Sequence, residues 1–366
     1  MRGRLALALA ALLLLGGCAQ LGYLGQAAGG HLQLLSAARP LDEWLAEPGL
    51  DERLRERLRL AREMRDFASR ELALPDNASY RRYAELKRGA VVWNVVAAPE
   101  LALTLKTWCY PLTGCAAYRG FFARQSAEDF AAALRREEPG LELYVYGVPA
   151  YSTLGWSNWL GGDPLLDTFI RYPEPELAGM IFHELAHQQV YVADDTAFNE
   201  SYASAVEQLG LRAWLAQRAD AAPLAGYQAR RQRREDFRAL VARYRGELAA
   251  LYASAQSADG KRAGKAQLLA ALRADYQRLK TESWGGDTGY DAWFASVNNA
   301  SLAIQAAYSD LTPAFEAVFV RAGRSWPAFH EQVRQLSVLP REERRRALMS
   351  AEAPQSRQAF EAKTQE

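Results

Sequence analysis

The chain has 366 residues, of which 49% are hydrophobic and 24% are charged, and its formal net charge at pH 7 is +1. This composition agrees with a globular body that forms one large domain or two smaller ones. A near-neutral charge leaves no basic field for nucleic acid, so we expect no nucleic-acid partner.

Residues 1–17 have the pattern of a bacterial lipoprotein signal peptide. Arg2 and Arg4 precede an apolar run, Leu5 to Leu15, that is too short to span a bilayer as a stable helix. The segment that ends at Cys18 then resembles a lipobox. Cleavage before Cys18 and acylation of its thiol and new amine would attach the mature protein to a lipid bilayer by several acyl chains. An ordinary secretory signal with an incidental Cys18 is the alternative.

The residue after this cysteine indicates the membrane. Ala19 stands where an aspartate would retain a lipoprotein in the inner membrane, by resemblance to the Gram-negative sorting rule. We therefore expect a lipid-anchored protein of the bacterial cell envelope, in the outer membrane and facing the periplasm. Residues 18–40, which are rich in Gly and Ala, are expected to form the acylated tether, and residues 41–340 the main domain.

Helices and strands are predicted for the first part of this domain. From Leu41 to Leu72, hydrophobic residues at helical spacing alternate with many charged ones, which predicts amphipathic helices with a solvated face. Ala90 to Ala98 is an apolar, β-branched run typical of a buried strand, with a helix as the alternative. Leu141 to Val148 predicts a second strand, which we expect in a small sheet flanking the site described below.

The segment after this second strand offers candidate substrate contacts. Tyr151 to Trp156 could supply an edge that binds an extended peptide by main-chain pairing. Tyr151, Trp156 and Trp159 are candidate pocket residues, with simple packing as the alternative.

Two cysteines remain if Cys18 carries lipid. Cys109 and Cys115 are separated by Pro111 and Gly114, which can turn the chain, so an oxidising periplasm favours a short-loop disulfide. Paired free thiols and a second metal site are the alternatives, and the absence of a nearby histidine disfavours the metal site.

The motif His183-Glu184-Leu185-Ala186-His187 is the main functional signal. Apolar residues at helical spacing predict a helix from Glu176 to Val192. Residues four apart share one helix face, so His183 and His187 can direct ring nitrogens at one ion, which we expect to be a single Zn²⁺. Glu184 is rotated by roughly 100° along the helix and is placed to act as the general base on water.

A catalytic zinc requires a third protein ligand. Glu200, near the start of a helix predicted from Asn199 to about Gln217, is the candidate. Glu207 lies on the same helix face and is expected to orient a histidine by accepting its other ring N–H, with direct ligation as the lesser possibility. Asp194 and Asp195 could also compete as ligands, but their position before the helix favours capping.

The rest of the chain is predicted to be helical. Residues 228–279 have the spacing of a long antiparallel helix pair with a polar break from Ser257 to Gly264, and a further helical segment runs from Asn298 to Phe319. The tail, residues 341–366, is charged and then polar, so we expect it to be frayed. The candidate side chains for stabilising an oxyanion are tyrosines, among which we favour Tyr308: Tyr151, Tyr172, Tyr191, Tyr202, Tyr290 and Tyr308.

The motif and its downstream glutamate resemble a known class of enzymes. His183 to His187, with Phe198 to Ala203, Glu207 and Gly210, is similar to the gluzincin metallopeptidases, whose third zinc ligand is a glutamate in an N-E-x-x-A context. The chain is more closely similar to the bacterial family described as predicted or putative aminopeptidases. The segments that carry this similarity are Phe67 to Leu72, Leu74 to Tyr80, Val91 to Glu100, Tyr118 to Gly120, Tyr151 to Trp156 and Asn298 to Ala300.

The chain also departs from the large aminopeptidases of this class. Only twelve residues, Gln188 to Asn199, separate the second histidine from Glu200, which is a shorter interval than theirs. Their substrate-anchoring G-x-M-E-N segment has no evident counterpart here.

These observations predict an α+β, predominantly helical protein with a gluzincin-like metallopeptidase core, a small flanking sheet and additional helices. The expected function is zinc-dependent hydrolysis of a peptide or protein substrate by a membrane-anchored aminopeptidase. The alternative is an envelope lipoprotein that uses the metal site for folding or as a scaffold for a partner, without turnover.

Overall fold

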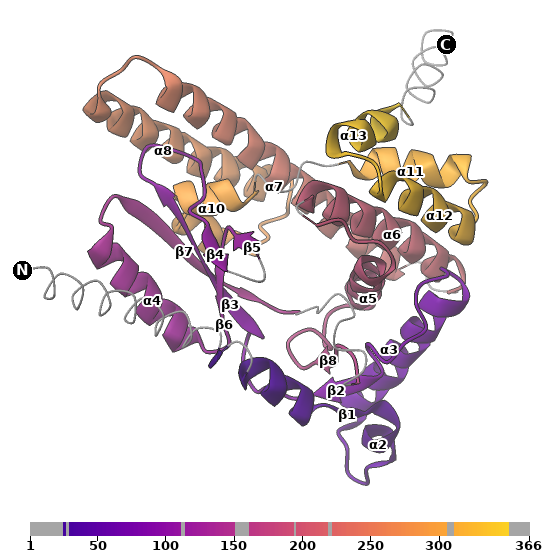
Figure 1. Ribbon diagram of the computed structural model, residues 1–366. Helices are drawn as coiled ribbons and strands as arrows, with labels where there is room; N and C mark the ends of the chain where they lie inside the picture. The colour runs from indigo at the N-terminus through magenta and orange to yellow at the C-terminus, as the bar shows by residue number, and fades with distance from the viewer. Residues whose placement is uncertain are drawn as a thin grey trace, which may run out of the picture.

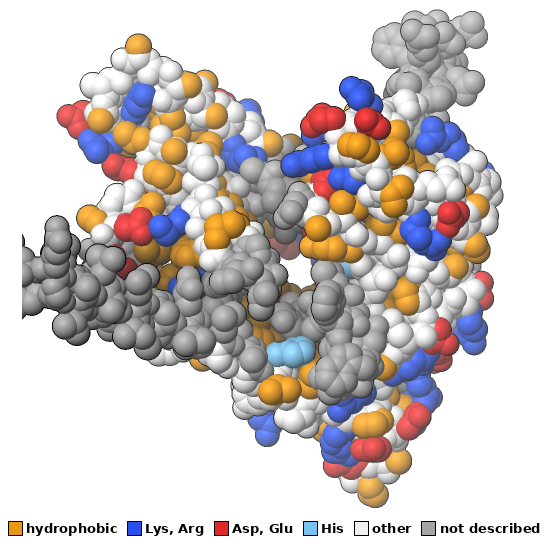
Figure 2. All heavy atoms as spheres, in the orientation of Figure 1, with side chains coloured by type: hydrophobic (Ala, Val, Ile, Leu, Met, Phe, Trp, Pro, Cys, Tyr) orange, Lys and Arg blue, Asp and Glu red, His pale blue; other side chains and the backbone are white. Residues whose placement is uncertain are grey.

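The computed structural model describes residues 25–26, 29–110, 114–150, 161–193, 195–218, 222–305 and 311–350. Helices predominate in this part of the chain and the strands form small sheets, which confirms the α+β, mainly helical class. In Figure 1, the helices that carry the predicted motif lie on one side of the molecule and the longest strands on the other. Figure 2 shows that the same face is hollowed between these two sides.

The N-terminal elements form a layer beneath the motif helix. In chain order they are β1 (Arg39–Pro40), α2 (Leu41–Ala46), α3 (Glu52–Arg70) and β2 (Arg82–Ala84), joined later by β8 (Leu165–Leu166). Helix α3 begins at the cap residue Asp51, which accepts a hydrogen bond from the backbone of Leu54. Leu58 and Met64 lie on its buried face, within the core that also contains the motif helix. The amphipathic helices predicted here are confirmed.

The longest strands form a separate sheet in the order β6-β3-β7. They are β3 (Val92–Pro99), β6 (Arg119–Phe121) and β7 (Leu141–Val148), and both neighbours pair antiparallel with β3. Successive side chains of β3 point to opposite faces. Val95 and Ala97 pack in the cluster with α4 (Arg124–Glu137), whereas Val96 and Ala98 pack against α10 (Asn299–Ile304). Both predicted strands are therefore present, and the helical alternative for Ala90 to Ala98 is wrong.

A hairpin between these strands contains a disulfide. Strands β4 (Trp108–Tyr110) and β5 (Gly114–Ala116) pair antiparallel, with Cys109 directly opposite Cys115. The structure joins the two cysteines by a disulfide, as the short loop predicts.

The side chain of Asn299 connects helix α10 to the β6-β3-β7 sheet. Its side-chain amide donates to the backbone carbonyls of Pro99, Glu100 and Ala102 at 3.0, 2.8 and 3.1 Å. Its side-chain oxygen accepts a hydrogen bond from the hydroxyl of Tyr252 at 2.9 Å. This buried side chain therefore links α10, the end of β3 and the long helix α7 (Ala222–Ala253).

Helix α7 and helix α8 (Ala258–Glu282) form the expected antiparallel pair, followed by the short helix α9 (Asp291–Ala295). The break between α7 and α8 is shorter than predicted. Ser257 caps α8 by accepting from the backbone of Gly260, and Gly264 lies inside the helix. A Cβ at Gly264 would lie only 2.9 Å from the side chain of Leu251 on α7. Glycine at this position therefore permits the close contact between α7 and α8.

The structure corrects the predicted tether and tail. Part of the expected tether, residues 29–37, is helical, and Leu34 is buried in the main core. At the other end, three helices pack together: α11 (Thr312–Arg321), α12 (Trp326–Ser337) and α13 (Arg341–Met349). Helix α13 is held because its Arg344 forms a buried ion pair with Asp195 at 2.8 Å, so the chain is ordered beyond Pro340.

Cys18 and residues 351–366 lie outside the described residues. Among the described helices, none is both long enough and apolar enough to cross a membrane.

His330 on α12 is completely buried. Its Nε2 lies 2.8 Å from the carbonyl oxygen of Leu72 and its Nδ1 lies 2.8 Å from the hydroxyl of Tyr202. The carbonyl can only accept, so Nε2 carries the proton and Nδ1 accepts from Tyr202. Burial lowers the pKa of His330 from 6.5 to about 4, because the charged imidazolium would lose its solvation.

We expect this histidine to make the fold acid-sensitive. Between pH 6.5 and 4 the unfolded chain binds a proton at His330 that the folded chain does not, so stability falls as the pH falls through this window. The full effect is about 3 kcal/mol, at 1.36 kcal/mol per pKa unit. Denaturant unfolding at pH 7.5 and at pH 5 would measure about 2 kcal/mol of this effect, because pH 5 lies about 1.5 units below 6.5, with His330→Gln as the control. If the wild type and the variant lose the same stability between these pH values, this prediction is wrong.

Candidate metal centre

The site is built on two adjacent helices. Helix α5 (Glu174–Gln189) carries the H-E-x-x-H motif and α6 (Thr196–Ala216) carries Glu200 and Glu207, and the two helices pack closely. Helix α5 forms because its apolar residues recur at helical spacing and are fully buried, as Leu177, Ile181 and Leu185 are.

The turn between the helices sets their register. Asp195 caps α6 by accepting a hydrogen bond from the backbone of Phe198 at 3.2 Å, so the capping role predicted for it is confirmed. Asn199 binds the turn from inside: its side chain accepts from the backbone N–H of Val192 at 2.8 Å and donates to the Val192 carbonyl at 2.7 Å. These contacts place Glu200, the next residue, opposite the two histidines. This role of Asn199 was not among the predictions from the sequence, although its amide within an N-E-x-x-A segment is a signal for one. Asp194 lies outside the described residues.

Three predicted ligands converge. The Nε2 atoms of His183 and His187 are 3.2 Å apart. The Glu200 carboxylate oxygens lie 3.4 Å from the His183 Nε2 and 3.6 Å from the His187 Nε2. Ligands at about 2.0–2.1 Å from a tetrahedral ion are about 3.4 Å from one another. The three side chains therefore have the spacing needed to hold one metal ion.

Glu207 fixes the orientation of His183. One of its oxygens lies 3.2 Å from the His183 Nδ1, so the ring can donate its Nδ1–H to Glu207, which leaves Nε2 as the ring atom that would bind an ion. Gly179, one turn before His183 on α5, leaves room for this contact. A Cβ at Gly179 would lie 3.1 Å from the Glu207 Cγ and 3.2 Å from one of its oxygens.

The charges of the site agree with a cation position. Burial lowers the pKa of His183, but hydrogen bonds to Glu200 and Glu207 outweigh it and raise this pKa well above 6.5. Burial and the neighbouring His183 lower the pKa of His187 to about 4. Burial opposes ionisation of both glutamates, yet their contacts with His183 keep the pKa values of Glu200 and Glu207 below 4.5. Glu200 and Glu207 are thus ionised, whereas His183 and His187 disfavour each other's protonation. The two negative charges favour a cation between these side chains.

One side of the site reaches solvent. The side chain of Glu200 is 30% exposed, whereas that of His187 is 7% exposed. Among the described residues, the Nδ1 atom of His187 is buried without a hydrogen-bond partner. Glu184 is half-buried on the same helix. The partial exposure of Glu200 agrees with a site that a substrate can approach.

The tyrosines predicted as candidates for stabilising an oxyanion lie in different parts of the structure. Tyr202 is buried and bonded to His330, so it serves the core. Tyr290 packs in the cluster between α7 and α8, and Tyr191 is 51% exposed. Tyr172 packs against the main core. Tyr308 and the pocket candidates Tyr151, Trp156 and Trp159 lie outside the described residues.

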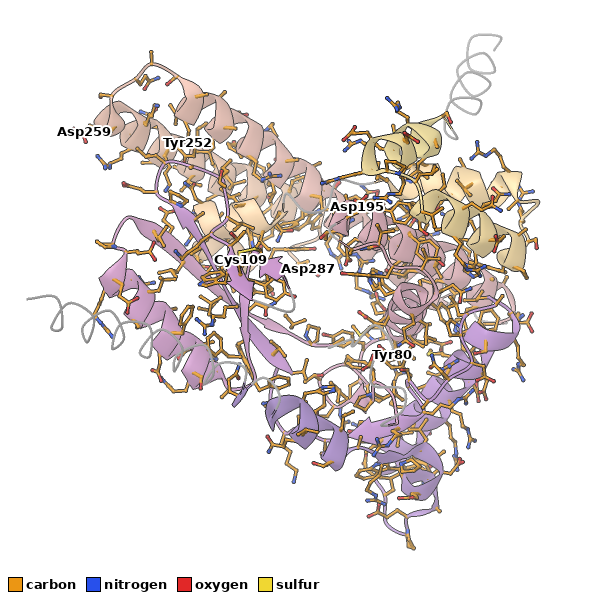
Figure 3. All side chains as sticks on the ribbon, in the orientation of Figure 1. Tyr80, Cys109, Asp195, Tyr252, Asp259 and Asp287 are labelled. Carbon is orange, nitrogen blue, oxygen red and sulfur yellow. A yellow bond between two sulfur atoms is a disulfide. The ribbon has the colours of Figure 1, made fainter. Side chains whose placement is uncertain are left out.

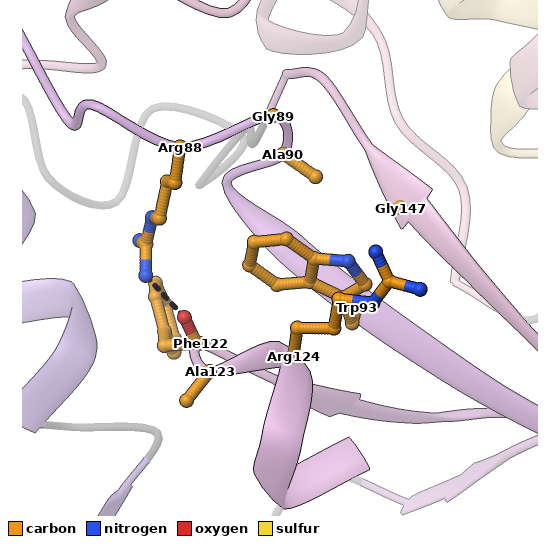
Figure 4. Close-up of a pocket in the computed structure, with 8 residues that line it drawn as sticks. All are labelled: Arg88, Gly89, Ala90, Trp93, Phe122, Ala123, Arg124 and Gly147. Atoms are coloured by element: carbon orange, nitrogen blue, oxygen red, sulfur yellow. Dashed lines mark hydrogen bonds between the residues drawn. The ribbon is translucent and has the colours of Figure 1, made fainter. Parts of the chain in front are cut away.

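A cavity of about 600 Å³ lies elsewhere, at the end of the β6-β3-β7 sheet. Figure 4 shows its lining, in which Trp93 lies between Arg88 and Arg124, and Arg88 donates to the carbonyl of Phe122. This lining contains no carboxylate and no imidazole, so it cannot supply a set of metal ligands. This cavity is therefore not a candidate metal site.

Removal of the Glu207 carboxylate is expected to weaken metal binding without abolishing it. Loss of a group that orients a metal-binding histidine costs about 10- to 100-fold in affinity. We expect Glu207→Ala to show such a loss in a competition titration with a chromogenic chelator. Glu207→Gln retains an acceptor for the His183 N–H and should lie between Ala and wild type. Equal metal affinities for wild type and both variants would show that Glu207 does not support metal binding.

Comparison with known proteins agrees with the geometry. A protein family described as "putative aminopeptidase" matches residues 22–348, which is most of the chain. No curated protein and no solved structure matches it. The matched region includes α5, α6 and the whole described core. The chain therefore belongs to the putative aminopeptidase family.

Proposed function

We propose that the protein is a zinc-dependent peptidase of gluzincin type. The convergence of His183, His187 and Glu200, with donor atoms spaced for a tetrahedral ion and Glu184 beside them, is the observation that supports this most directly. Family membership supports peptide hydrolysis at a coarser level. Two imidazoles and one carboxylate form a donor set that suits Zn²⁺ in hydrolases.

The residues have distinct roles in this proposal. Zinc, when bound, polarises the substrate carbonyl and lowers the pKa of water to about 7. His183, His187 and Glu200 hold the ion, and Glu207 keeps the His183 ring in the required tautomer. Glu184 takes the proton of the attacking water and then delivers it to the leaving amine.

We further propose that the enzyme acts as an aminopeptidase anchored in the cell envelope through an acylated Cys18. The family description supports the first part and the lipobox-like segment supports the second. A non-catalytic scaffold has less support, because a purely structural metal site needs neither an adjacent base nor an exposed side.

Metal analysis and cleavage of a peptide library test this proposal together. The protein lacking residues 1–18 is expected to contain one zinc per chain, to cleave peptides and to lose cleavage when treated with a chelator. N-terminally blocked peptides should resist cleavage if the enzyme is an aminopeptidase. Zinc binding without cleavage would favour the non-catalytic scaffold. A protein that binds no metal would refute both the zinc peptidase and the metal-binding scaffold.

A further inference from the structure

Tyr80 has a hydroxyl group that nothing in the metal-site proposal explains. The residue lies in the loop between α3 and β2, is 2% exposed, and packs beneath α5 (Figure 3). Among the described residues, no group forms a hydrogen bond with its hydroxyl. A buried hydroxyl without a partner is unfavourable, because it has lost its hydrogen bonds to water without replacement.

The backbone of Tyr80 is also unusual. Its φ is +63°, in the left-handed region that bulky residues seldom adopt. Neighbouring residues hold it there: the Tyr80 N–H donates to the carbonyl of Asp163 at 2.7 Å, and the Asp163 N–H donates to the Ser79 Oγ at 3.1 Å. Gly162 packs against this loop so closely that a Cβ would lie 2.4 Å from the Ser79 nitrogen. The fold thus maintains a strained tyrosine with an unsatisfied hydroxyl.

The loop is attached to the motif helix next to the proposed base. Gln188 accepts from the Asn77 side chain at 2.8 Å and donates to the Ser79 Oγ at 3.1 Å. Gln188 follows Glu184 by four residues, so the two side chains lie on the same face of α5. The buried Arg65 supports the loop from the other side by donating to the Ser79 carbonyl at 2.8 Å. These contacts attach the loop that contains Tyr80 to the face of α5 that carries Glu184.

The electrostatics keep the Tyr80 hydroxyl protonated. Burial raises its pKa well above 10, and the negative charges of Glu184 and Asp163 raise it further. Arg65 opposes this shift but does not reverse it. The group is consequently a neutral hydrogen-bond donor at any physiological pH, next to a carboxylate that can accept.

We infer that Tyr80 is a positioning residue, whose hydroxyl donates a hydrogen bond to the Glu184 carboxylate when that group turns toward its substrate. This inference rests on the proposed function, because it assigns Tyr80 a role in holding the base of that reaction. Fixing one oxygen of Glu184 leaves the other directed at the water. The free energy lost to the unpartnered hydroxyl would be recovered when the base is in use.

Tyr80→Phe separates this role from simple packing, because it removes only the hydroxyl. If the residue only packs, the variant should be as active as wild type and equally or more stable, since an unsatisfied buried group is lost. If it positions Glu184, kcat should fall about 10- to 100-fold, a loss of the size seen when a supporting hydrogen bond is removed. KM should change by less than about twofold, because substrate binding is not altered. Zinc content and melting temperature should not fall.

Tyr83→Phe is the matched control. Tyr83 is 1% exposed and lies three residues along the chain, but the charges near its hydroxyl are those of Glu85 and Asp167. Its variant should retain the wild-type kcat.

Several results would overturn the inference. A Tyr80→Phe kcat within about twofold of wild type would do so, and so would a loss of melting temperature or zinc that accounts for the loss of activity. If wild type hydrolyses peptides with zinc while Tyr80→Phe is unimpaired, only the role of Tyr80 fails. If wild type does not hydrolyse peptides, the proposed function fails and the role of Tyr80 fails with it.

Discussion

Replacing Glu184 with glutamine is expected to reduce peptide hydrolysis by about 10²- to 10⁴-fold, the usual contribution of a general acid–base group. The amide has nearly the same shape as the carboxylate but cannot accept a proton from water. The three proposed metal ligands are untouched, so zinc content should equal that of wild type. Steady-state kinetics and elemental analysis on the same preparation measure both properties.

A second carboxylate-to-amide change controls for charge. Glu128 lies on α4 in an exposed ion pair with Arg124, away from the metal centre, so Glu128→Gln should leave kcat unchanged. Unaltered turnover in Glu184→Gln would show that this residue is not the base. Loss of zinc together with activity would instead mean that Glu184 supports the metal site.

Glu200→Ala is expected to cause the largest loss of metal affinity. It removes one of three protein ligands and also the carboxylate that offsets the positive charge of the ion. The loss should therefore exceed the 10- to 100-fold expected for Glu207→Ala, whose side chain acts through His183. Zinc at 1,000 times its dissociation constant stabilises a folded protein by about 4 kcal/mol, so wild type should show a large thermal shift and Glu200→Ala little or none.

Gln208→Ala, on the same helix, is a suitable control because this residue does not belong to the cluster of potential ligands. Its thermal shift with zinc should equal that of wild type. A normal zinc-dependent shift in Glu200→Ala would exclude Glu200 as a ligand, and the third ligand would then have to come from another residue.

The local parts of the site could be predicted from the sequence because helix geometry fixes them. His183 and His187 are four residues apart on one helix, and Glu200 and Glu207 are seven apart on the next, so each pair shares a face. Once both helices are predicted, the two pairs of side chains meet if the turn between the helices brings these faces together.

The contacts that stabilise this arrangement could not be predicted in the same way. Gln188 reaches a loop more than 100 residues earlier in the chain. Arg344 looked like part of a charged, frayed tail, because nothing in its local sequence indicates that Asp195 will lie beside it. Spacing within an element follows from backbone geometry, whereas pairs between distant segments depend on the assembled fold.

The buried pair between Arg344 and Asp195 has a consequence for the order of folding. Arg344 donates to the side chain of Asp195, and Asp195 caps the helix that carries Glu200. Arg344 follows Asp195 by 149 residues, so a chain that emerges from its N-terminus, during synthesis or during export across a membrane, presents Asp195 well before Arg344. The cap can form without Arg344, but we expect the start of this helix to gain its full stability only when α13 docks. Early intermediates would contain both histidines but hold Glu200 loosely, which would delay tight metal capture until the last helix docks.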